Sequence, residues 1–302
     1  MVVATMMRRN RIFYSAAGIL FLVLFRLQWN YLLFINDPAP ATSNDCQFVG
    51  FTDNDKNTPA APDNLPQVAC VIYTYHGNRE LITETYVSWG HHCQVFEAFS
   101  DEAWEYSLGK VSIPLRTYPA PKEDLNMDIK KMWNYLGDRY HDGTLNADFV
   151  TFSGDDAFFI IPALRKYLGT LSSPGESSRL LVGGTDGETR NSDFPWIGGA
   201  GYAVSRQLIE EKVLCKCDAD GLFASSEDVF TSRCLYQNGV KFTDTRDSLG
   251  KYRFCRSFPG DSCDYYEQIE PSDEVVLFHY VNGTTRIELT QKYYDHGTLS
   301  SI

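Results

Sequence analysis

Two adjacent carboxylates follow a short apolar segment near the middle of the chain, in the sequence Gly154-Asp155-Asp156. A hard cation held by one or two carboxylates, with diphosphate oxygens completing its shell, is the usual form in which Mg²⁺ and Mn²⁺ take part in phosphate chemistry. Neighbouring side chains on an extended segment point to opposite sides. We therefore expect one carboxylate to bind a cation and the other to orient it or to contact the ligand. The alternative is a solvated turn, because Gly and Asp are common turn residues.

Two other segments carry side chains that could join this chemistry. Glu227 and Asp228 precede a predicted helix that runs to Cys234, and Asp228 is a candidate general base. An acidic pair also suits a helix N-terminus through the helix dipole alone. His279 ends the apolar run 275–278, where a lone histidine is more often a core residue than a ligand.

A glycine-rich segment, Gly198-Gly199-Ala200-Gly201, follows closely after Trp196. Its spacing is not that of a dinucleotide-binding fingerprint, but its glycines allow a ligand or another strand to approach the backbone closely. Trp196 could stack on a sugar or belong to the core. With Glu227, the residues Trp196, Gly198 and Gly199 are candidates for contacting a sugar or an acceptor.

The elements that must position these side chains alternate between short apolar runs and amphipathic segments. We predict strands over 69–75, 95–99, 148–153 and 180–182, and helices over 78–92, over 122–140 and from Pro162 onwards. Such alternation predicts an α/β domain with a mostly parallel sheet. Ligands bind outside the carboxyl ends of the strands in such a sheet, and Thr74, Asp101 and the pair Asp155 and Asp156 fall there. We interpret these strand ends as a nucleotide-binding cleft.

Composition and cysteine content limit the class of protein. The 302-residue chain has a net charge of −12, which argues against a nucleic-acid-binding protein, because such proteins concentrate basic side chains on one face. Its eight cysteines include no C-x-x-C pair, which argues against a structural zinc site. Scattered cysteines behind an apolar N-terminal segment are typical of disulfides formed in an oxidising compartment. Counting alone does not define how they pair.

The N-terminal segment predicts a membrane anchor with a lumenal body. Arginines precede the apolar run 12–25, and a second apolar stretch, 27–35, follows Arg26. Together the two stretches reach the roughly 20 residues that span a bilayer, and basic residues before them predict a cytoplasmic N-terminus. The alternative is a signal peptide cleaved near 39–41. The predicted organisation is a cytoplasmic tail over 1–11, a signal-anchor helix over 12–35, a flexible stem over 36–66 and a globular domain over 67–302.

Seven segments between about residues 67 and 295 match, in order, the motifs of one known family. They are Val68–Ile72, Tyr86–Cys93 (T-W-x-x-x-C), Ala147–Phe158 (D-W-F-L-K-A-D-D-D-T-Y), Gly198–Ser205 (G-G-A-G-Y-V-L-S), Glu227–Leu235 (E-D-…-R-C), Arg246–Gly250 (R-D-T-I-G) and Phe278–Leu289 (F-H-Y-V-D-S-T-T-x-x-E-L). The chain thus resembles the glycosyltransferase family that contains the β1,3-galactosyltransferases, the β1,3-N-acetylglucosaminyltransferases and Fringe. The last segment points most specifically to the core 1 branch of that family.

The resemblance implies a GT-A fold, a UDP-sugar donor, Mn²⁺ as cofactor and an inverting reaction. It implies that Asp156 binds the metal with Asp155 beside it, that His279 is the distal metal ligand and that Asp228 is the catalytic base. The residues implied in nucleotide binding are Thr74, Arg79, Asp101 and Asp155. In the core 1 branch the reaction transfers galactose in β1,3 linkage to O-linked GalNAc on glycoproteins, in the Golgi or endoplasmic reticulum membrane.

The resemblance also bears on the cysteines and on glycosylation. Cys70–Cys93 and Cys217–Cys234 match disulfides of the family, and we expect Cys255–Cys263 as a third pair. Cys46, in the stem, is a candidate for an intermolecular bridge in a homodimer. Asn282 begins an N-glycosylation sequon, consistent with a lumenal domain.

Gly154 departs from the family pattern, because it stands where the family has the first acid of its triplet. Residues i and i+2 share a face, so Asp156 lacks its companion on the same side. This departure motivates one alternative, a catalytically silent lumenal chaperone or lectin-like relative. A second alternative, which concerns only the donor sugar, is a transferase that uses UDP-GlcNAc or UDP-Glc.

Overall fold

The computed structural model describes most of the predicted globular domain. The described residues are 64–102, 107–108, 111–112, 115–117, 125–171, 179–185, 197–218, 226–257, 262–263, 269–281 and 283–294. The predicted tail and span lie outside them, as do the predicted stem up to residue 63, Cys46, Trp196 and Asn282, so these predictions remain predictions. None of the described helices combines the length and the apolar character that crossing a bilayer requires.

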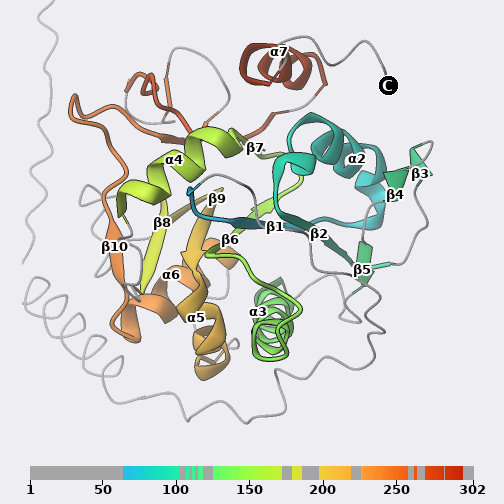
Figure 1. Ribbon diagram of the computed structural model, residues 1–302, viewed down its shortest axis with the longest axis vertical. Coiled ribbons are helices and arrows are strands. Elements are labelled where there is room, and N and C mark those ends of the chain that lie inside the picture. Colours follow the sequence, from blue (N-terminus) through green and yellow to red (C-terminus); the bar gives the residue numbers. More distant parts are fainter. Residues whose placement is uncertain are drawn as a thin grey trace, which may run out of the picture. The chain divides into compact units, whose positions relative to one another are not determined.

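The described residues contain a seven-stranded sheet in the order β10-β8-β9-β6-β1-β2-β5 (Figure 1). Its strands are β1 (Val68–Tyr73), β2 (Val95–Ser100), β5 (Leu115–Thr117), β6 (Phe149–Gly154), β8 (Leu180–Thr185), β9 (Ile197–Ser205) and β10 (Lys241–Thr243). Strand β9 runs antiparallel to both its neighbours, and the other neighbouring pairs are parallel. The predicted α/β class with a mostly parallel sheet is therefore confirmed. The glycine-rich β9 was not predicted as a strand.

Helices cover both faces of this sheet (Figure 1). Those on one face are α2 (Arg79–Ser88), α4 (Ile161–Leu171) and α7 (Gly283–Tyr293), and those on the other are α3 (Leu125–His141), α5 (Arg206–Glu210) and α6 (Glu227–Gln237). In β1, Cys70 and Ile72 join the apolar core under the first group, whereas Ala69 and Val71 join the core under the second. This alternation is the two-residue period of a strand that is buried on both faces.

The helix predicted over 122–140 is present as α3, from Leu125 to His141. Its residues Ile129, Met132 and Trp133 are fully buried, as the 3.6-residue period requires. Helix α4 begins at Ile161, one residue before the predicted start, and places Pro162 in the first turn, where a missing N–H removes no helical hydrogen bond.

Among the described residues, three disulfides link elements of the domain, and all three match the predicted pairs. Cys70–Cys93 joins β1 to the end of the turn that follows α2, and Cys217–Cys234 joins α6 to the segment before it. Cys255–Cys263 closes a loop between two segments near the C-terminal part of the domain.

A second, three-stranded sheet in the described residues consists of β7 (Phe158–Phe159), β12 (Leu277–Phe278) and β11 (Phe254–Cys255). Strand β12 is central, antiparallel to β7 and parallel to β11. Because β7 follows β6 and β12 lies far along the chain, this small sheet brings the ends of distant segments together.

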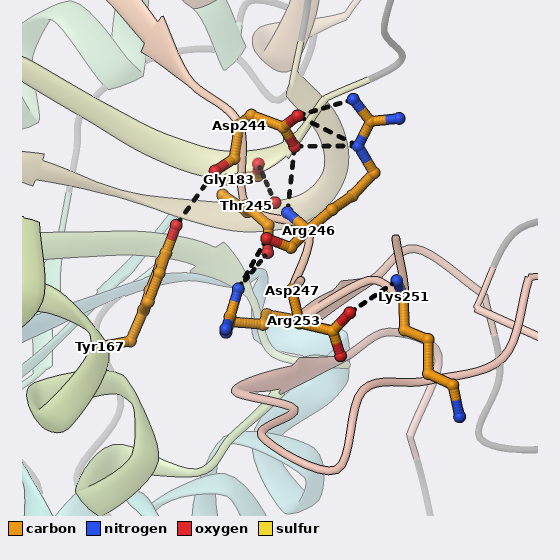
Figure 2. A network of polar contacts seen from close by, with 8 residues as sticks. All are labelled: Tyr167, Gly183, Asp244, Thr245, Arg246, Asp247, Lys251 and Arg253. Atoms are coloured by element: carbon orange, nitrogen blue, oxygen red, sulfur yellow. Dashed lines mark hydrogen bonds and ion pairs between the residues drawn. The ribbon is translucent and has the colours of Figure 1, made fainter. Parts of the chain in front are cut away.

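The chain between β10 and β11 is fixed by a network of polar contacts around Arg253 (Figure 2). The Arg253 Nη1 atom donates to the carbonyl oxygens of Thr245 and Arg246 at 3.3 and 2.7 Å, and its guanidinium lies over the ring of Tyr167 in α4. Asp247 accepts hydrogen bonds from the backbone N–H groups of two residues in its own turn, one of them Lys251 at 2.9 Å. The segment that resembles R-D-T-I-G is thus a structural turn that leads the chain into β11.

Candidate active site

Asp156 and His279 are brought together by the second sheet. Asp156 lies in the turn between β6 and β7, and His279 follows β12 directly. The Val281 N–H donates to the Asp156 carbonyl oxygen at 2.7 Å, and pairing of Phe278 with Phe158 fixes the register between the two turns. As a result, His279 Nε2 lies 3.6 Å from Asp156 Oδ2. Two atoms at this separation can bind the same metal ion.

The ring of His279 is oriented by a backbone carbonyl. Its Nδ1 atom lies 3.2 Å from the carbonyl oxygen of Arg256. Because a carbonyl oxygen only accepts, Nδ1 must carry the proton, and neutral imidazole then has its lone pair on Nε2. That lone pair is on the side of Asp156, which is the arrangement of a metal-binding histidine whose second nitrogen is held by the protein.

Asp228 and Gly199 complete the group. Asp228 lies in the first turn of α6, and its Oδ1 accepts from the N–H of Val229 at 2.8 Å. A Cβ atom built on Gly199 would lie 3.4 Å from Asp228 Oδ2 and 3.9 Å from His279 Cε1. Gly199 is exposed, so its missing side chain leaves an accessible space between the carboxylate and the imidazole.

Helix α6 is held in this position by a contact with β9. The Ser232 hydroxyl donates to the Asp228 carbonyl oxygen at 2.6 Å and accepts from the N–H of Ile197 at 2.9 Å. Since Ile197 begins the strand that contains Gly199, the same hydroxyl fixes the helix end and the glycine strand relative to each other.

The Asp155 carboxylate points away from this space, into the protein. It accepts hydrogen bonds from the Thr74 hydroxyl and from Asn78 Nδ2, the latter at 3.0 Å. Burial raises its pKa, although these two donors oppose the effect. Its carbonyl oxygen accepts from Thr85 and from the buried Arg286, at 2.8 and 2.9 Å. Asp155 and Asp156 thus face opposite sides, as the alternation rule predicts, and Asp155 anchors the turn that carries Asp156.

The residues assigned to nucleotide binding lie together at the carboxyl ends of β1 and β2. Thr74 is buried against Asp155. Asp101 accepts from the His76 backbone N–H at 2.7 Å and pairs with the His76 ring at 2.8 Å, which lowers the pKa of Asp101 against the opposing effect of its burial. A pocket of about 590 Å³ opens there, lined in part by His76, Asn78 and Arg79. Because the sheet reverses its strand order between β1 and β6, this is the edge at which ligands of α/β sheets bind.

Glu227, beside Asp228, is fully buried rather than open to the shared space. Its carboxyl group accepts from Tyr202 at 2.8 Å, and from Tyr73 and Thr231 at 3.2 Å each. Burial raises the pKa of Glu227 from 4.5 to about 7; the Tyr202 hydroxyl opposes this change, and the negative charge of Asp228 adds to it. When Glu227 is protonated, it places no negative charge beside Asp228.

This raised pKa predicts that the protein loses stability as the pH rises from about 4.5 to 7.5. Below pH 4.5 the Glu227 carboxyl is protonated in both the folded and the unfolded chain, so its contribution to stability is fully present. Between 4.5 and 7 the unfolded chain releases this proton and the folded chain does not, at about 1.4 kcal/mol per pH unit and of the order of 3 kcal/mol in total. Urea unfolding across this range should show the loss in the wild type.

The matched variants isolate the contribution of Glu227. Glu227→Gln should flatten the pH dependence of the unfolding free energy, whereas Glu288→Gln, on the exposed side of α7, should leave it unchanged. Equal slopes in the wild type and Glu227→Gln would show that Glu227 titrates normally.

Asp156 and His279 can hold a divalent cation only if phosphate oxygens or water complete the coordination shell of the cation. The described residues contain no cluster of three or more His, Cys, Asp or Glu side chains arranged to hold a metal ion. Cations that act on phosphate groups, however, commonly bind through one or two protein ligands together with phosphate oxygens and water. The Nε2 atom of His279, the nearby Asp156 carboxylate and the open space over Gly199 suit such a cation.

Sequence reasoning missed several residues that hold the site. Asn78, Tyr73, Tyr202 and Arg286 all bind its acidic residues. Tyr202 and Arg286 lie in motif segments, but the motifs do not indicate these contacts. Arg256 acts on His279 through its backbone, which carries no side-chain signal.

Comparison with solved structures shows distant likeness in fold. No protein-family profile matches the chain. The structure is similar to the crystal structure of a glycosyltransferase involved in the glycosylation of the major capsid of PBCV-1, with a TM-score of 0.41 and 10% sequence identity over 76% of this chain and 98% of that chain. A likeness at this level does not define a family, so the function has to be proposed from the site.

Proposed function

We propose that this protein is an inverting glycosyltransferase of the GT-A type that moves a sugar, most specifically galactose, from a UDP-sugar in β1,3 linkage to a glycan acceptor such as O-linked GalNAc. The proposal includes a single-pass type II anchor in the Golgi or endoplasmic reticulum membrane. The observation that carries it is the convergence of Asp156, His279 and Asp228 around the space over Gly199.

The three polar side chains suit the parts of a single displacement. The Asp228 carboxylate, with its Oδ2 on the side of Gly199, is placed to take the proton of an acceptor hydroxyl. The acceptor oxygen would form a bond to the anomeric carbon while the bond from that carbon to the β-phosphate oxygen breaks, and UDP leaves with its electron pair. Asp156 and His279 would hold Mn²⁺, whose contribution is to neutralise the charge on the diphosphate.

The nucleotide would occupy the neighbouring strand ends. Asn78, which lines the pocket beside His76 and Arg79, donates a hydrogen bond to Asp155, the residue before Asp156. Arg79, exposed at the start of α2, could reach a phosphate or a ribose. Gly198 and Gly199 would allow the sugar to approach the backbone of β9.

A donor screen tests the proposal. The purified full chain, solubilised in detergent, would be incubated with a GalNAc-bearing peptide and UDP-Gal, UDP-GlcNAc or UDP-Glc, with Mn²⁺ or with EDTA. The expected result is transfer from UDP-Gal that requires Mn²⁺. Transfer from another of these donors would replace the galactose assignment. If none of the donors gave transfer or hydrolysis, that result would favour the silent relative that Gly154 suggests.

A further inference from the structure

The Nδ1 side of His279 contacts a segment that contains no residue predicted to bind the metal, the nucleotide or the acceptor. The Arg256 carbonyl oxygen accepts from His279 Nδ1, which leaves the Nε2 lone pair toward Asp156. In water the two neutral tautomers of imidazole are both accessible, and the hydrogen bond to the second nitrogen selects one of them. The Arg256 carbonyl oxygen therefore favours the tautomer in which Nε2 of His279 can bind a cation.

That oxygen is fixed on its N-terminal side by β11. Cys255 pairs with Phe278 across the second sheet, and the Val276 N–H donates to the Arg253 carbonyl oxygen at 2.8 Å. Arg253 belongs to the polar network that holds the preceding turn (Figure 2). The segment before Arg256 is therefore held in place by backbone and side-chain hydrogen bonds.

On its C-terminal side the oxygen is fixed by contacts across a closed loop. The Arg256 N–H donates to the Cys263 carbonyl oxygen at 2.9 Å, and the Ser257 hydroxyl donates to the Ser262 carbonyl oxygen at 2.7 Å. The Cys255–Cys263 disulfide covalently joins the same two segments, and Cys263 is itself bound to Ile269 through a backbone hydrogen bond of 2.7 Å. All these contacts act on the main chain beside Arg256.

The Arg256 side chain packs on the main sheet and makes none of these main-chain contacts. A Cβ atom on Gly198 would lie 2.3 Å from Arg256 Cδ, and one on Gly184 would lie 3.0 Å from Arg256 Cγ. The stem of Arg256 thus lies on two glycines of β8 and β9, beside the strand position that faces Asp228.

We propose that the Cys255–Cys263 disulfide is a positioning element of the metal site: it holds the Arg256 carbonyl that selects the metal-binding tautomer of His279, and its loss weakens cation binding. This inference rests on the proposed function for its metal, but not for its effect on His279. The expected loss of affinity is about 10–100-fold, the range found when a partner that orients a metal ligand is removed.

The first measurement reads the tautomer without any metal. The full chain with ¹⁵N-labelled histidine would be studied by NMR at about pH 8, where an ordinary imidazole is neutral, in the wild type, in Cys255→Ser/Cys263→Ser and in the control Cys70→Ser/Cys93→Ser. His279 should be protonated on Nδ1 in the wild type and the control and should be a mixture of tautomers in Cys255→Ser/Cys263→Ser. A single, unchanged tautomer in that variant would overturn the proposal.

The second measurement is a calorimetric titration of the same proteins with Mn²⁺. We expect the Kd to rise 10–100-fold in Cys255→Ser/Cys263→Ser and to stay within about threefold in the Cys70–Cys93 control. An equal rise in both variants would overturn the positioning role, because it would reflect general loosening of the fold. If the wild type bound no Mn²⁺, the proposed function would fail, and the tautomer result would still decide whether the disulfide positions His279.

Two single substitutions keep the test decisive if the double variant does not fold. Ser257→Ala removes one contact across the loop and retains the disulfide, so it should shift His279 toward the mixed state with a smaller rise in Kd, of about threefold. Arg256→Ala keeps the carbonyl oxygen and should leave the tautomer unchanged. A wild-type tautomer in Ser257→Ala, or a mixed tautomer in Arg256→Ala, would count against the proposal.

Discussion

Asp228→Asn is expected to lower the rate of sugar transfer 10²–10⁴-fold, the range over which a positioned general base contributes. Asn has the shape of Asp but cannot accept the proton of the acceptor hydroxyl. The hydrogen bond from the Val229 N–H to Asp228 Oδ1 and that from Ser232 to the backbone can both persist, so α6 should stay in place. The Kd for the donor should change little, because the substitution removes a proton acceptor and no contact to UDP. Transfer rates under saturating donor, with UDP binding measured separately, check both statements.

The matched control is Asp142→Asn. Asp142 is exposed in the turn after α3, and its carboxylate accepts hydrogen bonds from the N–H and the hydroxyl of Thr144. It makes the same chemical change at a residue with no contact to the site and should keep wild-type turnover. Near-normal turnover in Asp228→Asn would refute the assignment of Asp228 as base, and loss of donor binding along with transfer would point instead to a structural role.

The main sheet could be predicted because its strands are buried on both faces. Such strands are continuous apolar runs, and β1, β2, β6 and β8 lie where those runs were recognised. Strand β9 was not predicted because three of its first five residues are glycines, which are rare in strands. Its role explains its composition: Gly198 accommodates the Arg256 stem, and Gly199 leaves the space beside Asp228.

Only those site residues could be predicted from the sequence whose side chains belong to a recognisable motif. Alternation along an extended segment correctly gave opposite directions to Asp155 and Asp156, but not which of them faces inward. The partners of Asp155 lie 70 and more residues away along the chain, at Thr85, Asn78, Thr74 and Arg286. Such contacts follow from the packing of the sheet and leave no local pattern.

In the structure, the absence of a side chain at Gly154 makes room for the side chain of Asp156. A Cβ atom at this position would lie 2.9 Å from Asp156 Oδ1. The carboxylate that the family pattern places at 154 is absent here, and the Asp156 side chain itself occupies the space next to that backbone. The departure therefore changes the surroundings of Asp156 without removing its access to His279.

Asp156→Asn is expected to weaken Mn²⁺ binding at least 100-fold and to abolish Mn²⁺-dependent transfer, because it removes the charged member of a two-residue metal site. Asp155→Asn makes the same change one residue earlier, where the carboxylate binds Thr74 and Asn78; it should lower the melting temperature and affect the Kd for Mn²⁺ less. His279→Ala and the double variant Asp156→Asn/His279→Ala complete a cycle. If both side chains bind one ion, the double variant loses little more affinity than the worse single variant, since neighbouring ligands of one ion are not additive. Independent, additive losses in calorimetric titrations would mean that the two residues do not share a cation, in spite of the 3.6 Å between Asp156 Oδ2 and His279 Nε2.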